Sequence, residues 1–256
     1  MNLSNLIKNL LNLQKKVDTK LLPSQGLFYK EDFEIQIKKA DGKDVVEYEH
    51  NYKKDNLGEI IKRVKKIVES NIILPHSYSF NDLKSIDIIF LFLEIVKFTK
   101  GKPISLSYFD EEIGVEDSIE FNSSYFNYFN IDNKIMESYN SEQRLFIIDG
   151  YKYSLPSIGA ENCLTSFLIH KTNQPNAVIY NTYYYDFTHF LDDKNFLTFK
   201  EIENLIQVFN FDIEESELKK VKKITKIFSP LQKYSLVKNG KIIEINSKID
   251  LEKIWK

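Results

Sequence analysis

Hydrophobic positions along the first half of the chain gather around one unusually apolar segment. In residues 86–98 only Asp87, Glu94 and Lys97 are polar, so a helix here is apolar on nearly every face. Such a helix must be covered on most sides by other elements, and it is too short and too often charged to cross a bilayer. We therefore predict a buried helix. Its expected capping residues are Ser79 or Asn81 at the start and Gly101 with Pro103 at the end.

The first 20 residues predict an amphipathic helical arm. Leucines recur at intervals of three and four residues, with mostly Asn, Lys and Gln between them, and the apolar seam consists of Leu3, Leu6, Leu10, Leu13 and Val17. The repeat covers about two heptads, which is too short to identify a coiled coil. Two interpretations remain open, namely packing against the rest of the chain and docking on a helix of a partner protein.

A shaped turn is predicted at residues 22–29, Leu-Pro-Ser-Gln-Gly-Leu-Phe-Tyr. Pro23 fixes its own φ and favours an extended residue before it, and Gly26 permits a positive φ. Phe33, Ile35 and Ile37 then alternate with polar residues, which predicts a half-buried strand. Asp41-Gly42 predicts a hairpin turn, with residues 45–48 as the returning strand.

The next predicted elements are a helix over residues 56–70 and a strand over residues 103–109 that returns to the same core. The helix carries Lys62, Arg63, Lys65 and Lys66 beside its apolar stripe. A basic helix of this kind fits nucleic acid, but a solvated face is the more common explanation. The acidic turn around Gly114 lacks the regular ligand spacing of a calcium loop, so we interpret it as a solvated loop.

The second half of the chain predicts a short strand over residues 145–148 and then a second turn, Leu155-Pro156-Ser157-Ile158-Gly159. This turn matches residues 22–26 at four of five places, which indicates either a reused turn or an internal duplication. Helices are predicted from Ser157 towards His170, over residues 198–209 and over residues 213–228. In the last of these, acidic residues come first and lysines later, as the helix dipole favours.

The C-terminal end predicts a β-hairpin. Asn239-Gly240 lies between the alternating runs 234–238 and 241–245, and this dipeptide is a strong hairpin signal. Leu251, Ile254 and Trp255 predict a short anchoring helix. These elements together predict an α+β fold with a helical arm (residues 1–20), an N-terminal α/β domain around the buried helix (21–118) and a mainly helical C-terminal domain ending in the hairpin (119–256).

Charge and cysteine content narrow the classes of function. The 35 basic residues nearly balance the 37 acidic ones, so no bulk field attracts nucleic acid or anionic lipid. Cys163 is the single cysteine, which excludes an internal disulfide and indicates a reducing compartment or a virus particle assembled in one. The N-terminal segment lacks the apolar core of a signal peptide, and no run approaches a membrane span. We therefore expect a soluble protein without a membrane partner.

Aromatic residues are dense between residues 180 and 190. Aromatic platforms that stack nucleic-acid bases come with basic grooves, whereas the neighbours here are Asp186, Asp192 and Asp193. Nucleic acid is therefore disfavoured as a partner. Rings of this kind suit protein contacts or ordinary core packing, and the candidate contact residues are Tyr183, Tyr184, Tyr185 and Phe187.

No residue spacing in the chain identifies a reaction. The four histidines His50, His76, His170 and His189 are widely spread, and with one cysteine a zinc site is not expected. Ser157 and Cys163 lack the surroundings of a known nucleophile, and no Gly-rich phosphate loop occurs. Asp212, Glu217 and Lys219 resemble the acidic and lysine pattern of metal-dependent nucleases, although the helix dipole accounts for the same charges. We expect no catalytic residue, metal or cofactor, with a nuclease or a nucleic-acid-binding module as the alternatives.

The first turn and the buried helix together carry a resemblance to a known family. The matching residues are Leu22, Pro23, Ser24, Gly26 and Tyr29 in the turn, and Asp82, Leu83 and Asp87 at the start of the helix. In these residues and in the order of its elements, the chain resembles the baseplate hub assembly family of T-even-type contractile-tailed phages over roughly residues 20–115. The resemblance implies a non-enzymatic structural or assembly protein that contacts other tail proteins, in the virion baseplate or in the host cytoplasm during assembly.

The candidate partner-binding residues lie in three places, the leucine seam, the end of the first turn and the aromatic cluster. They are Leu3, Leu6, Leu10, Leu13, Leu27, Phe28, Tyr29, Tyr183, Tyr184, Tyr185 and Phe187. A structural role is expected for the residues that shape the two Leu-Pro-Ser turns, which are Leu22, Pro23, Ser24, Gly26, Pro156 and Gly159.

Overall fold

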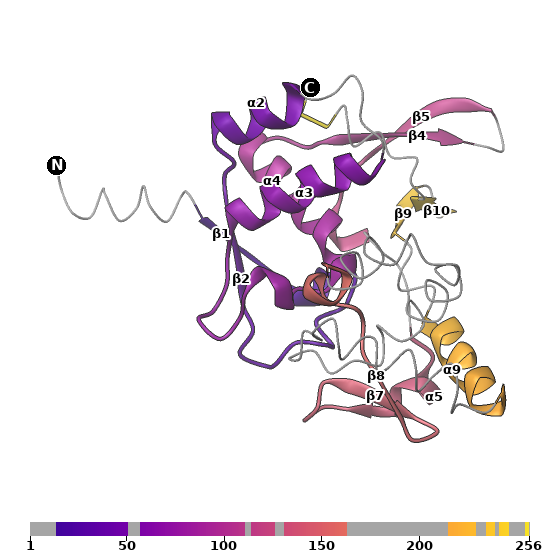
Figure 1. Cartoon of the computed structure of the whole chain (residues 1–256). Helices are drawn as coiled ribbons and strands as arrows, with labels where there is room; N and C mark the ends of the chain where they lie inside the picture. Colours follow the sequence, from indigo (N-terminus) through magenta and orange to yellow (C-terminus); the bar gives the residue numbers. More distant parts are fainter. Residues whose placement is uncertain are drawn as a thin grey trace, which may run out of the picture.

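The structure is a computed structural model that describes residues 14–50, 57–110, 114–125, 131–162, 215–228, 234–238, 241–245 and 254–255. It contains helices together with antiparallel sheets, so the predicted α+β class is confirmed (Figure 1). Among these residues no helix has the length and apolar character that a membrane crossing requires.

Helix α4 (Ile88–Lys100) lies at the centre of the fold, as predicted (Figure 1). Every residue from Ile88 to Val96 is buried, including the acidic Glu94. Gly101 ends the helix in the left-handed region at a φ of 64°, and its N–H donates to the carbonyl of Lys97. Ser79 does not cap α4 itself. It caps a 3-10 turn, η2 (Phe80–Asp82), and a second such turn, η3 (Ser85–Asp87), leads into the helix.

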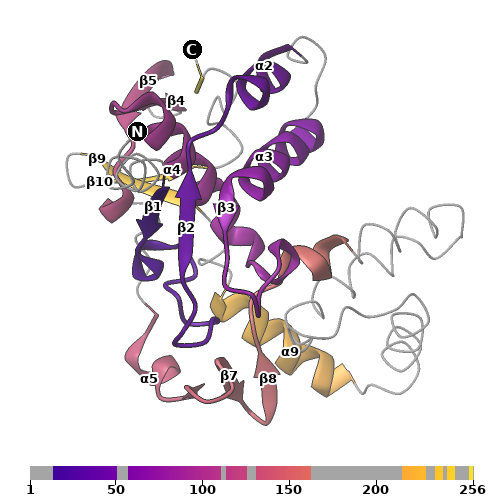
Figure 2. The ribbon, with the colours of Figure 1, turned by 90° about the vertical axis from the view of Figure 1, so that its left-hand side faces the viewer.

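Strands β1 (Gln14–Val17), β2 (Ile35–Lys38) and β3 (Ile72–Ile73) form an antiparallel sheet with β2 in the middle (Figure 2). The predicted strand around Ile35 and Ile37 is confirmed, since both side chains are fully buried in alternation with polar neighbours. The prediction of helix is wrong for residues 14–17, because all four pair with β2. Residues 1–13 of the predicted arm lie outside the described residues. The short 3-10 helix η1 (Thr19–Leu21) follows β1.

The predicted returning strand at residues 45–48 is wrong, because Gly42–His50 form helix α2. The side chain of Asp41 accepts a hydrogen bond of 2.8 Å from the backbone N–H of Asp44, which is the bond an N-cap makes. Asp41-Gly42 therefore starts a helix instead of turning a hairpin. Tyr48 of α2 packs its ring 5.4 Å from that of Phe92 in α4.

Helix α3 (Leu57–Asn71) packs alongside α4 and confirms the helix predicted over residues 56–70. Its side chains Val64, Ile67 and Val68 are buried in the same core as the apolar residues of α4. The apolar stripe of this helix is thus the face that packs against the core around α4.

Strands β4 (Ser105–Asp110) and β5 (Val115–Glu120) form a two-stranded antiparallel hairpin that extends from the body (Figure 1). This confirms the predicted strand at residues 103–109. Glu116 and Asp117, interpreted as part of an acidic loop, belong to β5. The short 3-10 helix η4 (Ser123–Tyr125) follows β5.

A second core lies at the other end of the molecule from α2 and the β4–β5 hairpin (Figures 1 and 2). Here β6 (Tyr139–Asn140), β7 (Leu145–Ile148) and β8 (Tyr151–Tyr153) form an antiparallel sheet, with the short helix α5 (Asn133–Met136) beside it. Helix α9 (Glu215–Phe228) stacks the ring of Phe228 on that of Tyr153 at 4.1 Å. The strand predicted at 145–148 is confirmed, and the helix predicted at 213–228 is confirmed over Glu215–Phe228.

The predicted C-terminal hairpin is confirmed by strands β9 (Tyr234–Lys238) and β10 (Lys241–Ile245). They pair in antiparallel register, with Lys238 opposite Lys241 and Tyr234 opposite Ile245. Ile254 and Trp255 are buried in the core around α4, and the ring of Trp255 lies 6.3 Å from that of Phe92. Leu251 lies outside the described residues.

Segments on the two sides of residue 119 share both cores. The core around α4 takes in Phe121, Ile158 and Trp255, and the second core takes in Phe28 and Ile86 from the first half of the chain. The division into two domains stays a prediction. The described part of the second half contains a three-stranded sheet in addition to its helices.

Candidate functional site

The two Leu-Pro-Ser turns begin at Leu22 and Leu155, which are 133 residues apart in the chain. They lie on either side of residues 83–87, the segment that leads into α4. From one side, residues 155–159 bond to it through the backbone: the Ser85 N–H donates to the Pro156 carbonyl at 3.0 Å, and the Ile158 N–H donates to the Leu83 carbonyl at 2.8 Å. From the other side, residues 22–29 bond to it through the side chains of Ser24 and Tyr29. The two similar turns therefore hold one segment between them.

The first turn adopts an unusual backbone conformation. Gln25 and Gly26 both have positive φ, 55° and 72°, and the Gln25 N–H donates to the Leu22 carbonyl at 2.7 Å. A Cβ at position 26 would lie 3.2 Å from the carbonyl oxygen of Thr19. Glycine suits this position on both counts, because it tolerates the left-handed region and has no Cβ. The turn aims Ser24 at the start of α4.

The Asp87 carboxylate is the acceptor on which the first turn converges. The backbone N–H of Ser24 donates to its Oδ1 at 2.8 Å, and the Ser24 hydroxyl donates to its Oδ2 at 2.7 Å. The Tyr29 hydroxyl also donates to Oδ2, at 2.7 Å, and itself accepts from the Lys84 backbone N–H at 2.8 Å. A buried carboxylate needs such donors, since an unpaired charge in the interior is very costly.

Burial raises the pKa of the Asp87 carboxyl from 3.8 to about 6. Loss of hydration is the largest cause, because it disfavours the charged form. The hydrogen bonds from Tyr29 and Ser24 and the charge of Lys84 act in the opposite direction. The carboxyl is thus ionised at neutral pH, and it takes up a proton in mildly acidic solution.

Lys84 supplies a positive charge to the same interior. Its ammonium group donates at 3.0 Å to the hydroxyl of Ser154 and at 3.0 Å to the carbonyl of Leu155, and it lies 5.7 Å from the centre of the Phe28 ring. The aromatic face and the two oxygens replace part of the hydration that the ammonium loses. Residues 83–87 therefore bond to both turns through side chains. Lys84 bonds to the second turn, and Asp87 bonds to the first.

The pairing of Ser154 with Lys84 has the residue types of a serine nucleophile and a lysine base, but its geometry favours a structural role. A nucleophile and its base must be accessible to a substrate, whereas both of these side chains are buried and Lys84 also donates to the carbonyl of Leu155. Ser154 is 6% exposed and Lys84 1% exposed. The network joins three segments of the chain, residues 22–29, 83–87 and 154–155, and its hydrogen bonds hold these segments together.

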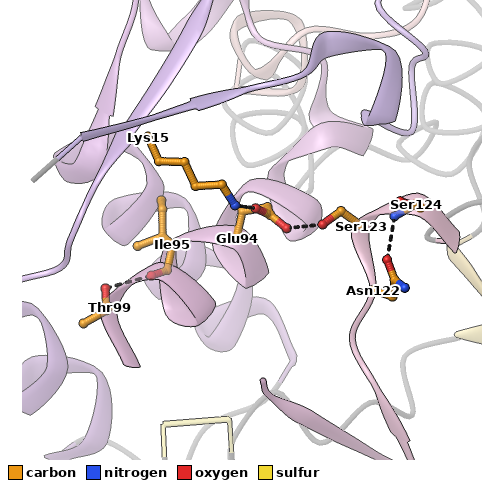
Figure 3. A network of polar contacts seen from close by, with 7 residues as sticks. All are labelled: Lys15, Glu94, Ile95, Thr99, Asn122, Ser123 and Ser124. Carbon is orange, nitrogen blue, oxygen red and sulfur yellow. Dashed lines mark hydrogen bonds and ion pairs between the residues drawn. The ribbon is translucent and has the colours of Figure 1, made fainter. Parts of the chain in front are cut away.

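A second buried acid lies further along α4. The side chain of Glu94, 4% exposed, accepts from the Lys15 ammonium at 2.6 Å and from the Ser123 hydroxyl at 2.6 Å (Figure 3). Lys15 belongs to β1 and Ser123 to η4, so Glu94 joins the N-terminal strand and the segment after the β4–β5 hairpin to the central helix. Lys15 is 41% exposed, which leaves one side of this ion pair in contact with solvent.

The structure corrects part of the predicted contact surface. Phe28 and Tyr29 are only 4% and 3% exposed, because Phe28 packs in the second core and Tyr29 stacks its ring on Phe33 at 4.0 Å. They do not form a surface for a partner in this structure. Leu27 is partly exposed beside the second core. Of the residues expected to shape the turns, Leu22 and Ser24 are buried and the carbonyl of Pro156 accepts from Ser85. Gly159 is the second of the helical residues that follow Ser157.

Several predicted contact residues and candidate chemical groups lie outside the described residues. These are Leu3, Leu6, Leu10, Leu13, Cys163, His170, Tyr183, Tyr184, Tyr185, Asp186, Phe187, His189 and Asp212. Of the nuclease-like set, Glu217 and Lys219 lie on α9, where Lys219 is exposed. Within the described ranges, no three His, Cys, Asp or Glu side chains are grouped so as to hold a metal ion.

Sequence reasoning did not find the roles of Lys84, Ser154, Glu94 and Lys15. One signal was available in the sequence. Lys84 and Asp87 lie at the edge of an apolar run, where charged groups need partners inside the fold. The partners of Glu94 had no such signal, because they lie 79 residues before it and 29 residues after it.

Comparisons with protein-family models, curated proteins and solved structures gave no match for this chain. The family resemblance therefore rests on residues 22–29 and 82–87 alone.

Proposed function

We propose that this protein is a non-enzymatic structural or assembly component of a contractile phage tail baseplate hub, which acts through contacts with other tail proteins. One observation carries the proposal. The residues of the resemblance come from two stretches, 22–29 and 82–87, and in the fold Ser24 and Tyr29 of the first stretch bond directly to Asp87 and Lys84 of the second. The two stretches are thus parts of one structural unit, and the match concerns that unit.

The character of this unit also favours a building block over a catalyst. Its charged groups, Asp87 and Lys84, are buried and form hydrogen bonds with other segments of the same chain. Such a network specifies how turns and helix fit together. The partner contacts are then left to other residues, of which the leucine seam at Leu3, Leu6, Leu10 and Leu13 remains the leading candidate.

The proposal is tested by co-expression with the tail proteins encoded by neighbouring reading frames, followed by co-purification. We expect the wild-type chain to form a stable complex with one of them, and Leu6→Glu with Leu10→Glu to abolish that complex. Asn5→Glu with Asn9→Glu is the matched control, because it adds the same charge to polar positions of the same segment. Both variants are checked for the wild-type circular dichroism spectrum and unfolding midpoint.

Two outcomes would contradict the proposal. One is a failure of the wild-type chain to bind any tail protein and to appear in purified tails or their assembly intermediates. The other is metal-supported cleavage of nucleic acid that Glu217→Ala abolishes, which would assign the chain to the nuclease alternative.

A further inference from the structure

Residues 254–255 occupy a site between helices α2 and α4. The ring of Trp255 lies edge-on to two other rings, with its centre 6.4 Å from that of Tyr48 and 6.3 Å from that of Phe92. The Lys100 ammonium donates to the carbonyl of Ile254 at 2.6 Å. We call Tyr48, Phe92 and Lys100 the anchor site. Its occupants Ile254 and Trp255 are only 3% and 7% exposed, so the site encloses both side chains.

The anchor site is built from residues that also contact one another. The ring of Tyr48 packs 5.4 Å from that of Phe92, which joins α2 to α4. From α3, the Arg63 guanidinium lies 5.7 Å from the centre of the Tyr48 ring and donates to the Tyr48 carbonyl at 3.3 Å. Residues 42–100 therefore shape the site among themselves, and residues 254–255 enter it from a distant part of the chain.

The contacts in the anchor site are those of a separable peptide. Residues 254–255 form a turn and belong to no strand or helix of the core. The Nε1 of Trp255 is buried without a hydrogen-bond acceptor, so packing alone holds the ring. The bond from Lys100 goes to a main-chain carbonyl, which every peptide offers. None of these contacts requires the segment and the anchor site to belong to the same copy of the chain.

The segment lies where a second copy can approach. In both views the short yellow piece of residues 254–255 lies beside α2 at the top of the molecule (Figures 1 and 2). Ile254 is nine residues beyond Ile245, the end of β10, and nine residues span up to about 30 Å. We propose that the anchor site also receives residues 254–255 of a second copy, so that two copies exchange this segment. A second copy is the favoured donor because its Ile-Trp pair reproduces the contacts made within one chain, and exchange of an identical element is a low-cost route to a dimer.

Mixing two full-length variants tests the exchange. Variant A, Ile254→Ala with Trp255→Ala, removes the occupant and keeps the anchor site. Variant B, Tyr48→Ala with Lys100→Glu, keeps the segment and weakens the site. Because Trp255 is the single tryptophan of the chain, fluorescence of the mixture reports only the segment of variant B. We expect acrylamide to quench Trp255 readily in variant B alone. Adding variant A should protect Trp255 and give a one-to-one dimer in sedimentation velocity.

A third substitution locates the contact. Adding Lys100→Glu to variant A should weaken its binding to variant B at least about tenfold, because the ammonium that binds the Ile254 carbonyl is replaced by a carboxylate. Adding Lys102→Glu to variant A is the matched control, since Lys102 is exposed just beyond the end of α4. This control should bind variant B as variant A does.

Circular dichroism verifies that the variants are folded, and Trp255→Ala alone replaces variant A if the double substitution unfolds the chain. If Trp255 stays protected in variant B alone, a peptide of residues 249–256 serves as the donor, and its own tryptophan gives the signal. A variant A that binds neither donor overturns the proposal, and so does binding that Lys100→Glu leaves unchanged. Unfolding of both anchor variants would also overturn it, because the segment would then be an integral part of the core that cannot leave it.

Discussion

Ser24 holds both oxygens of the Asp87 carboxylate, one through its backbone N–H at 2.8 Å and the other through its hydroxyl at 2.7 Å. The two residues are 63 positions apart in the chain. Asp87 is the last residue before α4 and Ser24 belongs to a turn with two positive φ angles, so this contact joins the start of the central helix to a shaped turn.

Replacing Asp87 by Ala should destabilise the protein strongly. The change leaves the buried donors of Ser24 and Tyr29 without their acceptor. A buried polar group left without its partner typically costs about 1–3 kcal/mol, and at least two groups lose their partner here. Urea unfolding of Asp87→Ala measures this loss. Asp32→Ala, at an exposed position, is the control and should change the free energy of unfolding by less than about 0.5 kcal/mol.

The raised pKa of Asp87 gives an unusual pH dependence. Because the folded protein binds this proton more tightly, with a pKa of about 6 against 3.8 for the free side chain, lowering the pH through 6 stabilises the folded state. Between about pH 7.5 and pH 5 this carboxyl should add roughly 1.4 kcal/mol to the free energy of unfolding, the worth of one pKa unit. The measurement is the difference between wild type and Asp87→Asn across that range. A difference that does not depend on pH would show that the carboxyl has an ordinary pKa.

The Lys15–Glu94 ion pair should be worth more than the exposed pair between Lys16 and Glu34. Glu94 is almost fully buried, whereas both partners of the second pair are more than half exposed. A double-mutant cycle with Lys15→Ala and Glu94→Gln should give a coupling energy of about 1 kcal/mol. The same cycle on Lys16 and Glu34 should give a value close to zero, because solvent screens exposed pairs. Equal coupling energies would contradict a role for burial at Glu94.

Gly26→Ala should destabilise the first turn by about 1–2 kcal/mol. Gly26 has a φ of 72°, and a Cβ there would lie 3.2 Å from the Thr19 carbonyl oxygen. Gly42→Ala is a matched control at the start of α2, where a Cβ would meet nothing within 4 Å and φ is not positive. Thermal unfolding compares the two. We expect the control to be neutral or slightly stabilising, since alanine is the better helix former.

The candidate site could be predicted only in part. Pro23, Ser24 and Gly26 indicate a shaped turn from local backbone chemistry, and the structure contains that turn. The interpretation of Phe28 and Tyr29 as contact residues was wrong, because both side chains are buried. The local sequence around an aromatic residue in a turn does not show whether the fold covers that residue or leaves it exposed. What covers them is the second core and the Asp87 network, and these are built from segments far along the chain.

Local spacing alone determined α3, α4, β7, α9 and the β9–β10 hairpin, because helical periodicity, a short apolar run and an Asn-Gly turn act between near neighbours. Tertiary structure decided that Gln14–Val17 pair with β2, that Asp41 starts a helix, and that two Leu-Pro-Ser turns clasp residues 83–87. These outcomes depend on partners such as Ser154, which lies 70 residues from Lys84. The free energy of such contacts comes from burying and pairing groups that only the folded chain brings together.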